Sequence, residues 1–467
     1  MKLFRKDPFF YKNVFTLALP IAAQSLITIG VNMLDNIMVG SLGDNALSSV
    51  SLANSFISIY HIFCMGLGMG ASVLVSRYWG MKNTKDADAK AATLALKQTV
   101  SLMLRLTLGL ALLFALATLL IPNLIMSMYT DDQAIIQGGI EYLRYSIVTY
   151  FFLGTSLTTT IALRSVGQVK LPLFCSIGAF FINFGANYMF IFGKFGAPRM
   201  EVAGAALGTL IARVFEAGVI LGYLFLKDQR IGFRFKHLFM KTGSLIKEYI
   251  RICIPVLISD GILAIGNNSV AMVIGRLGSN FVAANAITAV TQQLSTVLIQ
   301  GVSQAGAIVT GQTLGTGEKD RTMRQGWMFL GLGLSLGTLS ALFIMLVKNP
   351  IIGTYSNVSA ETVEIAQQLM MAISLIIIFQ ATNSIMTKGV LRGGGDTKVL
   401  MVADNVFLWA VSLPLGILAG FVFKWSPFWI YVCLKFDQVA KTFWCVLRLR
   451  SGKWIKKITT GTNEAEA

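Results

Sequence analysis

Twelve long apolar segments are spread evenly along the chain, and they constrain its fold more than any other feature. Each is at least about 20 residues long, the length that an α-helix needs to cross a hydrocarbon core about 30 Å thick. We therefore expect an all-α integral membrane protein with twelve transmembrane helices. The segments are about 13–37, 52–75, 98–121, 140–161, 172–193, 203–226, 248–272, 283–307, 327–347, 364–387, 400–421 and 428–447.

The composition excludes several classes of protein. Only 13% of the 467 residues are charged, against about 25% in soluble domains, and no polar block separates the apolar segments, so no soluble catalytic domain is expected. No Gly-x-x-x-x-Gly-Lys-Ser/Thr motif occurs, which argues against ATP-driven transport. No nucleophile, base and orienting group can be assembled either, so an enzyme is not expected.

The cations fall on one side of the predicted topology. Lysine and arginine total 39 against 22 acids, a formal charge of +17. With a cytoplasmic N-terminus, the inner segments are rich in cations and the outer loops poor, which is the positive-inside pattern with both termini cytoplasmic. The charge thus needs no nucleic acid, and we expect a multi-pass protein of a prokaryotic inner (plasma) membrane. The inner cations include Lys2, Arg5, Lys6, Lys12, Arg77, Lys82, Lys85, Lys90, Arg164, Lys170, Lys319, Arg321, Arg324, Lys388, Arg392 and Lys398.

The two halves of the chain repeat each other. A shift of 235 residues matches several positions without a gap, and a shift of 228 matches the inner-loop motif at Arg164 to that at Arg392. We expect an N-lobe at 1–226, a cytoplasmic linker at 227–247, a C-lobe at 248–447 and a cytoplasmic tail at 448–467. Two similarly oriented six-helix, pseudo-symmetric bundles are typical of secondary transporters that use alternating access. The matches are Pro20 on Pro255, Asn32 on Asn267, Gly40 on Gly275, Gly43 on Gly278, Asn45 on Asn280 and Gly80 on Gly315.

Polar residues line one face of the first predicted helix. Gln24, Thr28, Asn32 and Asp35 are spaced 4, 4 and 3 residues apart, which places them on the same side of a helix. A carboxylate at membrane depth can bind a proton or a sodium ion. The alternative is an acid near the helix end that reaches the outer interface.

The fifth predicted helix places Asn183 and Asn187 one turn apart. Their amide oxygens could complete a sodium site with Asp35, or they could bond Asp35 when it is protonated. Amide bonds that only hold helices together are the alternative.

The sixth predicted helix presents Thr209, Arg213 and Glu216 on one face. Glu216 is a candidate second proton carrier. Alternatively, Arg213 and Glu216, three residues apart, neutralise each other.

Further polar residues occur in other predicted helices and could line a cavity or hold helices together. They are Asn54, His61, Asn267, Gln292 and Gln380. Asp260 and Asp404 lie nearer the cytoplasmic end and are interpreted as structural. Lys435, Asp437 and Lys441 fall within about two turns, which predicts an internal ion pair.

Several of these features together resemble the multidrug and toxic compound extrusion (MATE) family over nearly the whole chain. They are Pro20 to Gly43 with Asp35, its copy Pro255 to Gly278, the two Leu-Arg-x-x-Gly-x-x-Lys loops, and Asn183-x-x-x-Asn187 followed by Phe192-Gly193 and Gly204-Ala-Ala. The resemblance implies a twelve-helix antiporter that exports organic cations and drugs in exchange for protons or sodium. It also implies that Asp35 is the coupling acid of the N-lobe, accompanied by Asn183 and Asn187.

Two positions depart from the family pattern. Many relatives have an acid where this chain has Asn187, which removes one charge from a sodium site and favours protons. The acids of the C-lobe in the NorM branch correspond to Leu263 and Ala381 here. We therefore expect coupling in the N-lobe, with Asp260 as a weak substitute in the C-lobe.

The sequence thus predicts a proton-coupled or sodium-coupled exporter of amphipathic organic cations, acting as a monomer in the lipid bilayer without a cofactor. A flippase for lipid-linked oligosaccharides is the alternative in a related class, and it would need a strongly cationic cavity. A channel or receptor is a further alternative, which the repeat argues against.

Overall fold

The computed structural model describes residues 9–84, 88–243, 245–354 and 359–457. Four of the cations assigned above to the inner side, Lys2, Arg5, Lys6 and Lys85, lie outside these residues, as does the end of the predicted tail. The described part of the chain is helical and contains no strand. An all-α fold is therefore confirmed.

The first half of the chain contains seven α-helices, one π-helical extension and one short 3-10 helix among the described residues. The elements are α1 (Phe10–Gly40), α2 (Asp44–Lys82), α3 (Asp88–Leu120), α4 (Pro122–Ser127), α5 (Gln133–Ser165), α6 (Lys170–Phe192), α7 (Glu201–Gly222), η2 (Tyr223–Lys227) and η3 (Phe235–His237).

The second half repeats the long helices but has more π-helical turns, which lie in its fourth and fifth long segments. The elements are α8 (Leu245–Arg276), α9 (Ser279–Gly315), α10 (Lys319–Gly353), α11 (Ala360–Ser384), η4 (Ile385–Leu391), α12 (Thr397–Val406), η5 (Phe407–Ser412), α13 (Leu413–Ile417), η6 (Leu418–Val422), α14 (Pro427–Leu434) and α15 (Phe436–Ser451).

Eleven helical segments in the described residues are long and apolar enough to cross a membrane, and each coincides with a predicted span. The twelfth predicted span, 428–447, is formed by α14 and α15 together. These two helices meet at Lys435, whose backbone leaves the helical region. Close to the break lie the buried charged side chains of Asp437 and Lys441. The sequence predicted an ion pair here but did not predict a break in the helix.

The helices form two compact units. One contains the described residues among 1–22 and 254–458, and the other contains the described residues among 23–253. The boundaries fall inside α1 and α8, close to Pro20 and Pro255, which the repeat relates. A proline inside a helix removes a backbone hydrogen bond and favours bending, so both shared helices have a weak point near the boundary. The division into an N-lobe and a C-lobe at the linker 227–247 stays a prediction.

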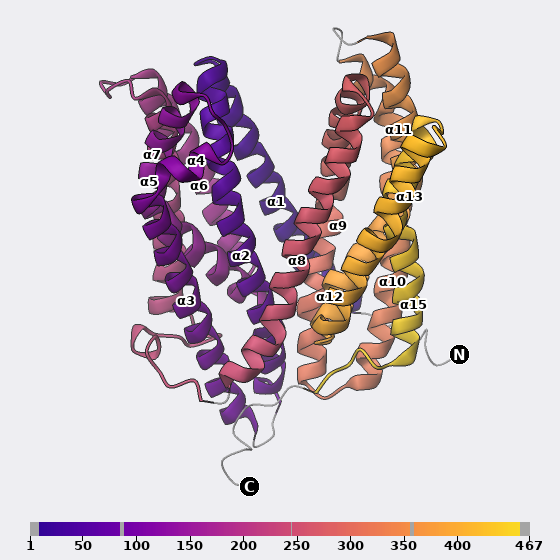
Figure 1. Cartoon of the computed structure of the whole chain (residues 1–467). Helices are drawn as coiled ribbons and strands as arrows, with labels where there is room; N and C mark the ends of the chain where they lie inside the picture. Colours follow the sequence, from indigo (N-terminus) through magenta and orange to yellow (C-terminus); the bar gives the residue numbers. More distant parts are fainter. Residues whose placement is uncertain (1–8, 85–87, 244, 355–358, 458–467) are drawn as a thin grey trace. The chain divides into compact units, whose positions relative to one another are not determined.

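Each unit has its own packing scheme. In the unit of residues 23–253, α2 packs on α3 and α5, and α7 packs on α5 and α6. In the other unit, α11 packs on α9, α10, α14 and α15 (Figure 1). Each unit therefore encloses an interior in which polar side chains from several helices can meet.

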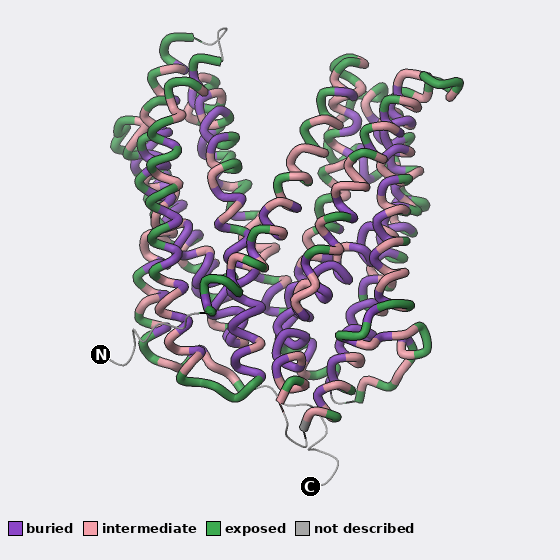
Figure 2. The backbone as a smooth tube through the Cα atoms, turned by 180° about the vertical axis from the view of Figure 1, so that it is seen from behind, coloured by how far each residue is buried: buried purple, intermediate pink, exposed green. Residues whose placement is uncertain are grey.

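Large apolar side chains are exposed along the outer helices, as a lipid-facing surface requires. On α3 these are Leu112, Leu113, Leu116, Leu119 and Leu120, and on α10 they include Leu339, Leu342 and Leu346. Exposed and buried stretches alternate along such helices (Figure 2). Because so much apolar surface is unstable in water, this pattern agrees with a membrane-embedded protein.

The backbone confirms the internal repeat at its glycines. Gly43 and Gly278, 235 residues apart, have φ values of 112° and 118° and immediately precede α2 and α9. Gly167 and Gly395, 228 residues apart, have φ values of 79° and 88°. Positive φ is accessible to glycine at little cost. Both shifts found in the sequence therefore correspond to repeated turns.

The arginines of the two inner-loop motifs bond corresponding helices. Arg164 donates to the amide oxygen of Gln24 on α1, and Arg392 donates to Asp260 on α8 at 3.1 Å. Each arginine thus bonds the first long helix of its own half of the sequence. This ion pair explains Asp260 as a structural residue, in agreement with its interpretation from sequence.

The linker between the halves is ordered by its own side chains. The carboxylate of Asp228 is buried and accepts backbone N–H groups of Ile231 and Gly232 at 2.9 and 3.0 Å. Nδ1 of His237 accepts the N–H of Arg234 at 2.9 Å. Burial and neighbouring cations such as Lys97 lower the pKa of His237 below its ordinary value, which suits this acceptor role because only a neutral imidazole has a free nitrogen.

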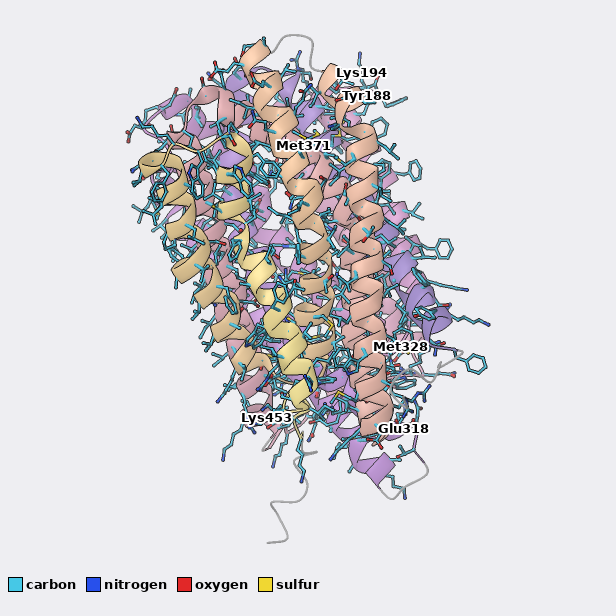
Figure 3. The ribbon with its side chains drawn as sticks, turned by 90° about the vertical axis from the view of Figure 1, so that its right-hand side faces the viewer. Tyr188, Lys194, Glu318, Met328, Met371 and Lys453 are labelled. Atoms are coloured by element: carbon cyan, nitrogen blue, oxygen red, sulfur yellow. The ribbon has the colours of Figure 1, made fainter. Side chains whose placement is uncertain are left out.

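The end of α15 and the segment after it pack on the loop that contains the second inner-loop motif, that of Arg392. Asp396 is almost fully buried and receives two hydrogen bonds from Arg448, at 2.7 and 3.0 Å. The backbone N–H of Lys456 donates to Gly394. In Figure 3, Lys453 and Glu318 lie near one end of this unit and Met371 lies toward the other end. Lys453, which follows α15, and Glu318, which precedes α10, therefore lie at the same end of this unit.

Replacing Asp396 with alanine should lower the free energy of unfolding by about 3 kcal/mol, because the change leaves the Arg448 guanidinium without its buried partner. Lys456 also approaches Asp396, at 3.5 Å, but its side chain is 43% exposed. Lys456→Ala should therefore cost less than about 1 kcal/mol. Unfolding of both variants in detergent, followed by tryptophan fluorescence, measures the difference. Equal losses would contradict the assigned docking.

Candidate functional site

The structure brings Asp35, Asn183 and Asn187 together. Nδ2 of Asn187 donates to Oδ1 of Asp35 at 2.6 Å and to Oδ1 of Asn183 at 3.4 Å. Asp35 comes from α1 and both asparagines come from α6, where a spacing of four residues places them on one face. Both asparagines are buried. The three residues that the sequence grouped as a coupling site thus form one hydrogen-bonded cluster.

A glycine on α7 allows this arrangement. A methyl group on Gly208 would lie 2.1 Å from Oδ1 of Asn187. One helical turn earlier, a methyl group on Gly204 would collide with the backbone of Phe190 on α6. The Gly-x-x-x-Gly pattern of α7 therefore lets the backbones of α6 and α7 approach closely, and Asn187 fills the space beside Gly208.

The orientation of the Asn187 amide determines what the cluster can bind. Its nitrogen lies between the oxygens of Asp35 and Asn183 and bonds both. Its oxygen lies against Gly208 and accepts no hydrogen bond from the described residues. Three oxygens therefore do not converge on one point, as a sodium ion would require. The described residues also contain no group of three His, Cys, Asp or Glu side chains placed to hold a metal.

Arg213 and Glu216 form the ion pair that the second interpretation of the sequence anticipated. Nη1 of Arg213 lies 2.6 Å from Oε2 of Glu216, whose side chain is mostly buried. Arg213 is also close enough to act electrostatically on Asp35 and His61. Glu216 therefore offsets the charge of Arg213 beside the cluster.

Tyr142 on α5 belongs to this site although the sequence did not single it out. Its hydroxyl donates to Oδ1 of Asn54 at 3.3 Å, and it lies close to Thr209 and Asp35. A tyrosine near the end of a membrane helix is too common to be recognised as a site residue from one sequence. Its contacts connect α2, α5 and α7 around the cluster.

The remaining candidates of this half lie away from the cluster or at the surface of the unit. Gln24 is buried, and its amide is held by Arg164 and by Ser176 at 2.6 Å, so it acts as a helix connector. The side chains of Thr28, Asn32 and His61 are exposed. The polar face predicted on α1 thus runs from a buried structural residue to exposed ones, with Asp35 half-buried.

A second polar site lies in the unit of residues 254–458. A cavity of about 200 Å³ there is lined by three predicted residues, Asn267, Gln292 and Gln380. Within its lining, Lys441 bonds two aspartates, Asp404 at 3.4 Å and Asp437 at 3.1 Å. An internal ion pair was predicted among Lys435, Asp437 and Lys441; the structure forms it between Asp437 and Lys441 and adds Asp404 as a second partner of Lys441.

The sequence model of the MatE family matches residues 20–189 and 255–418. The two matched stretches begin at the prolines that the repeat relates, and together they cover more than half of the chain. The chain belongs to the MatE family. This MatE protein is therefore a multi-pass membrane transporter and not an enzyme.

Named relatives of this MatE protein match over most of its length. A probable multidrug resistance protein NorM of Thermotoga maritima is 26% identical over 96% of this chain and 93% of its own. The uncharacterized transporter YisQ of Bacillus subtilis is 23% identical over 95% of each chain. A multidrug resistance protein NorM of Burkholderia vietnamiensis is 25% identical over 86% of this chain and 85% of its own.

Solved structures confirm the twelve-helix fold. A MOP superfamily transporter from Pyrococcus furiosus, described as having a binding pocket of reverse polarity, matches with a TM-score of 0.83 and 18% identity. An outward-facing multidrug resistance MATE family transporter matches with a TM-score of 0.82 and 20% identity. Each covers 97% of this chain and 98% of the solved chain. At such identities the likeness concerns the fold alone.

Replacing Gly208 with alanine should disrupt the cluster while leaving the MatE fold in place. The new methyl group would displace Asn187 from Asp35, so gradient-driven export should fall by about tenfold, the effect of losing one hydrogen bond to a charged group. Gly218 lies on the same helix with no atom within 4 Å of an added methyl group, so Gly218→Ala is the matched control. Export of a fluorescent cation from proteoliposomes measures both; equal activity would contradict the packing argument.

Proposed function

We propose that this MatE protein is an antiporter that exports amphipathic organic cations in exchange for protons. The observation that supports this most is the hydrogen bond between Asp35 and Asn187, which fixes one carboxylate among polar side chains from several helices. An isolated carboxylate at membrane depth is costly and usually functional. The names of the NorM relatives, which refer to multidrug resistance, agree with the proposed substrate class.

Protons are the proposed coupling ion for a structural reason. The amide nitrogen of Asn187 occupies the position between Asp35 and Asn183 where the oxygen of an acid would complete a sodium site. A proton needs only the carboxylate of Asp35. Sodium at Asp35, Asn183 and Asn187 is the alternative, and it requires the Asn187 amide to turn over.

Proton exchange at Asp35 would bias the conformational equilibrium of alternating access. A ligand shifts an equilibrium only when it binds the two states differently. In the proposed cycle, ionised Asp35 attracts the cationic substrate, and protonation of Asp35 releases it on the outer side. Arg213, offset by Glu216 at 2.6 Å, adds little net positive charge that would repel the substrate.

The pairing of Arg213 also favours export of cations over a flippase activity in this half of the protein. A flippase for lipid-linked oligosaccharides would need unpaired cations for its anionic head groups. We further propose that the transporter lies in the inner membrane with both termini on the cytoplasmic side, as the distribution of lysine and arginine indicates.

Export of ethidium from proteoliposomes tests the proposed function. A proton gradient and a sodium gradient are imposed separately on liposomes that contain the purified full-length protein. We expect export with the proton gradient alone. Export with the sodium gradient alone would replace protons by sodium as the coupling ion, and no export under either gradient would reject the antiporter and favour the flippase.

A further inference from the structure

The cavity in the unit of residues 254–458 differs in chemistry from a site for amphipathic cations. Its lining has only two apolar side chains, Leu263 and Leu408, and no aromatic ring. The other lining residues are polar or charged: Asn267, Gln292, Gln380, Asn383, Ser384, Thr387, Lys388, Asp404, Lys435, Asp437, Gln438 and Lys441. Sites for lipophilic ligands are mainly apolar and aromatic, so this cavity suits a small, strongly polar solute.

A continuous hydrogen-bonded network forms one wall of the cavity. Nδ2 of Asn383 donates to Gln438 at 2.7 Å, and Nε2 of Gln438 donates to Asp437 at 2.6 Å. Asp437 also accepts from Ser412 at 3.1 Å and pairs with Lys441 at 3.1 Å. With three donors, the carboxylate of Asp437 is satisfied by the protein and has little capacity left for a ligand.

One buried acceptor on this wall is not satisfied. Oδ1 of Asn383 is buried without a donor among the described residues, and the residue is only 6% exposed. Buried acceptors are normally hydrogen-bonded. Asp404, which pairs with Lys441 through Oδ1 at 3.4 Å, adds a carboxylate to the same lining. The oxygen of Asn383 and the carboxylate of Asp404 together indicate a ligand that donates hydrogen bonds, such as an ammonium group.

Two further lysines of the lining are Lys435, which lies close enough to Asp437 to interact electrostatically, and Lys388, whose side chain is exposed. Lys435 and Lys388 form no ion pair within the part of the chain that the structure describes, whereas Lys441 is shared by two aspartates. A lysine ammonium offers three donors and no acceptor. The two lysines therefore indicate a negatively charged group on the same ligand, such as a carboxylate.

We propose that this cavity binds a small zwitterion that has an ammonium and a carboxylate group, as an α-amino acid does. The ammonium group donates to Asn383 and Asp404, and the carboxylate accepts from Lys435 and Lys388. A volume of about 200 Å³ corresponds to about seven water molecules, which is enough for an amino acid and small for a drug. The site is separate from the Asp35 cluster and does not depend on the proposed export of cations.

Direct binding to the purified full-length protein in detergent tests the proposal. Scintillation proximity with tritiated L-alanine and tritiated L-glutamine measures saturable binding without any gradient. Two analogues of glutamine serve as competitors: 4-aminobutanamide lacks the carboxylate and glutaramate lacks the ammonium group. We expect saturable binding of at least one amino acid. Both analogues should compete with glutamine at least about tenfold more weakly than glutamine itself, because each loses a charge-assisted contact.

Two variants of the cavity and two controls locate the binding. Asn383→Leu and Lys435→Met should each weaken binding by at least about tenfold, since each removes one proposed contact. Asn405→Leu is the matched control, because Asn405 also has a buried oxygen without a donor but does not line the cavity. Asp35→Asn should bind amino acids as the unmodified protein does. Gel filtration and the unfolding midpoint establish that each variant is folded, and Lys435→Met tests the site independently if Asn383→Leu does not fold.

Three results would overturn the proposal. They are no saturable binding of either amino acid by the folded protein, equal competition by an analogue with a single charge, or unchanged binding by both cavity variants. If the unmodified protein binds amino acids but does not export ethidium, the result counts against the proposed antiporter and not against this site. The two proposals can therefore be rejected independently.

Discussion

The variant Asp35→Asn is expected to lose gradient-driven export of ethidium entirely, down to the rate of protein-free liposomes. The amide of the new residue matches the carboxylate in shape and can still accept from Asn187, which lies 2.6 Å away in the native protein. It can neither ionise nor exchange a proton. The variant should therefore fold normally and fail only in coupling. Ethidium efflux from proteoliposomes under a proton gradient measures the effect.

A control separates coupling from folding in this experiment. The control is a double variant that combines Asp35→Asn with Asn36→Asp. It moves the acid to the adjacent residue, whose side chain is exposed, and preserves the total charge of α1. The double variant should stay inactive because a shift of one residue turns the side chain by about 100° around the helix. Normal export by either variant would remove Asp35 from the mechanism.

Replacing Lys441 with methionine is expected to reduce the stability of the protein strongly. The side chains of Lys441, Asp404 and Asp437 are 3%, 6% and 3% exposed, and the lysine pairs with both aspartates. Without it, two buried carboxylates would face each other with no cation between them. The free energy of unfolding should fall by about 3–5 kcal/mol, the usual cost of breaking a buried ion pair from one side.

A second substitution tests the cause of this loss. In Lys441→Met with Asp404→Asn, only Asp437 stays charged, and it retains its contacts with Ser412 and Gln438. The double variant should therefore regain a substantial part of the lost stability. Unfolding midpoints in detergent give the comparison, and a double variant no more stable than Lys441→Met would contradict the triad as the cause.

The fold could be predicted largely from the sequence because membrane spans have a simple physical signal. A helix must satisfy its backbone internally in a bilayer, so length and apolar composition nearly determine each span. The repeat was likewise visible as two fixed shifts, and the glycines at 43 and 278 show the same turn. The break at Lys435 was not visible from the sequence, because the backbone N–H that follows it, that of Asp437, donates to Ser412, which is distant in the sequence.

The candidate site could be predicted in part. The spacing of Asn183 and Asn187 placed both on one face, and a carboxylate in a membrane helix is rare enough to single out Asp35. The helical spacing could not predict that Gln24 bonds Arg164 instead of lining a cavity, since this requires knowing which helices are neighbours. Tyr142 and the contacts of Asp437 with Ser412 and Gln438 were not predicted for the same reason: their residue types are ordinary and only their contacts are informative.

Proton release upon substrate binding tests the central proposal most directly. Tetraphenylphosphonium is added to the purified full-length protein in a weakly buffered detergent solution, and the pH change is recorded at increasing concentrations. If the cation displaces a proton from Asp35, protons are released in a saturable way, and Asp35→Asn releases none while still binding. Saturable binding without proton release, or the same release from Asp35→Asn, would contradict proton antiport at Asp35.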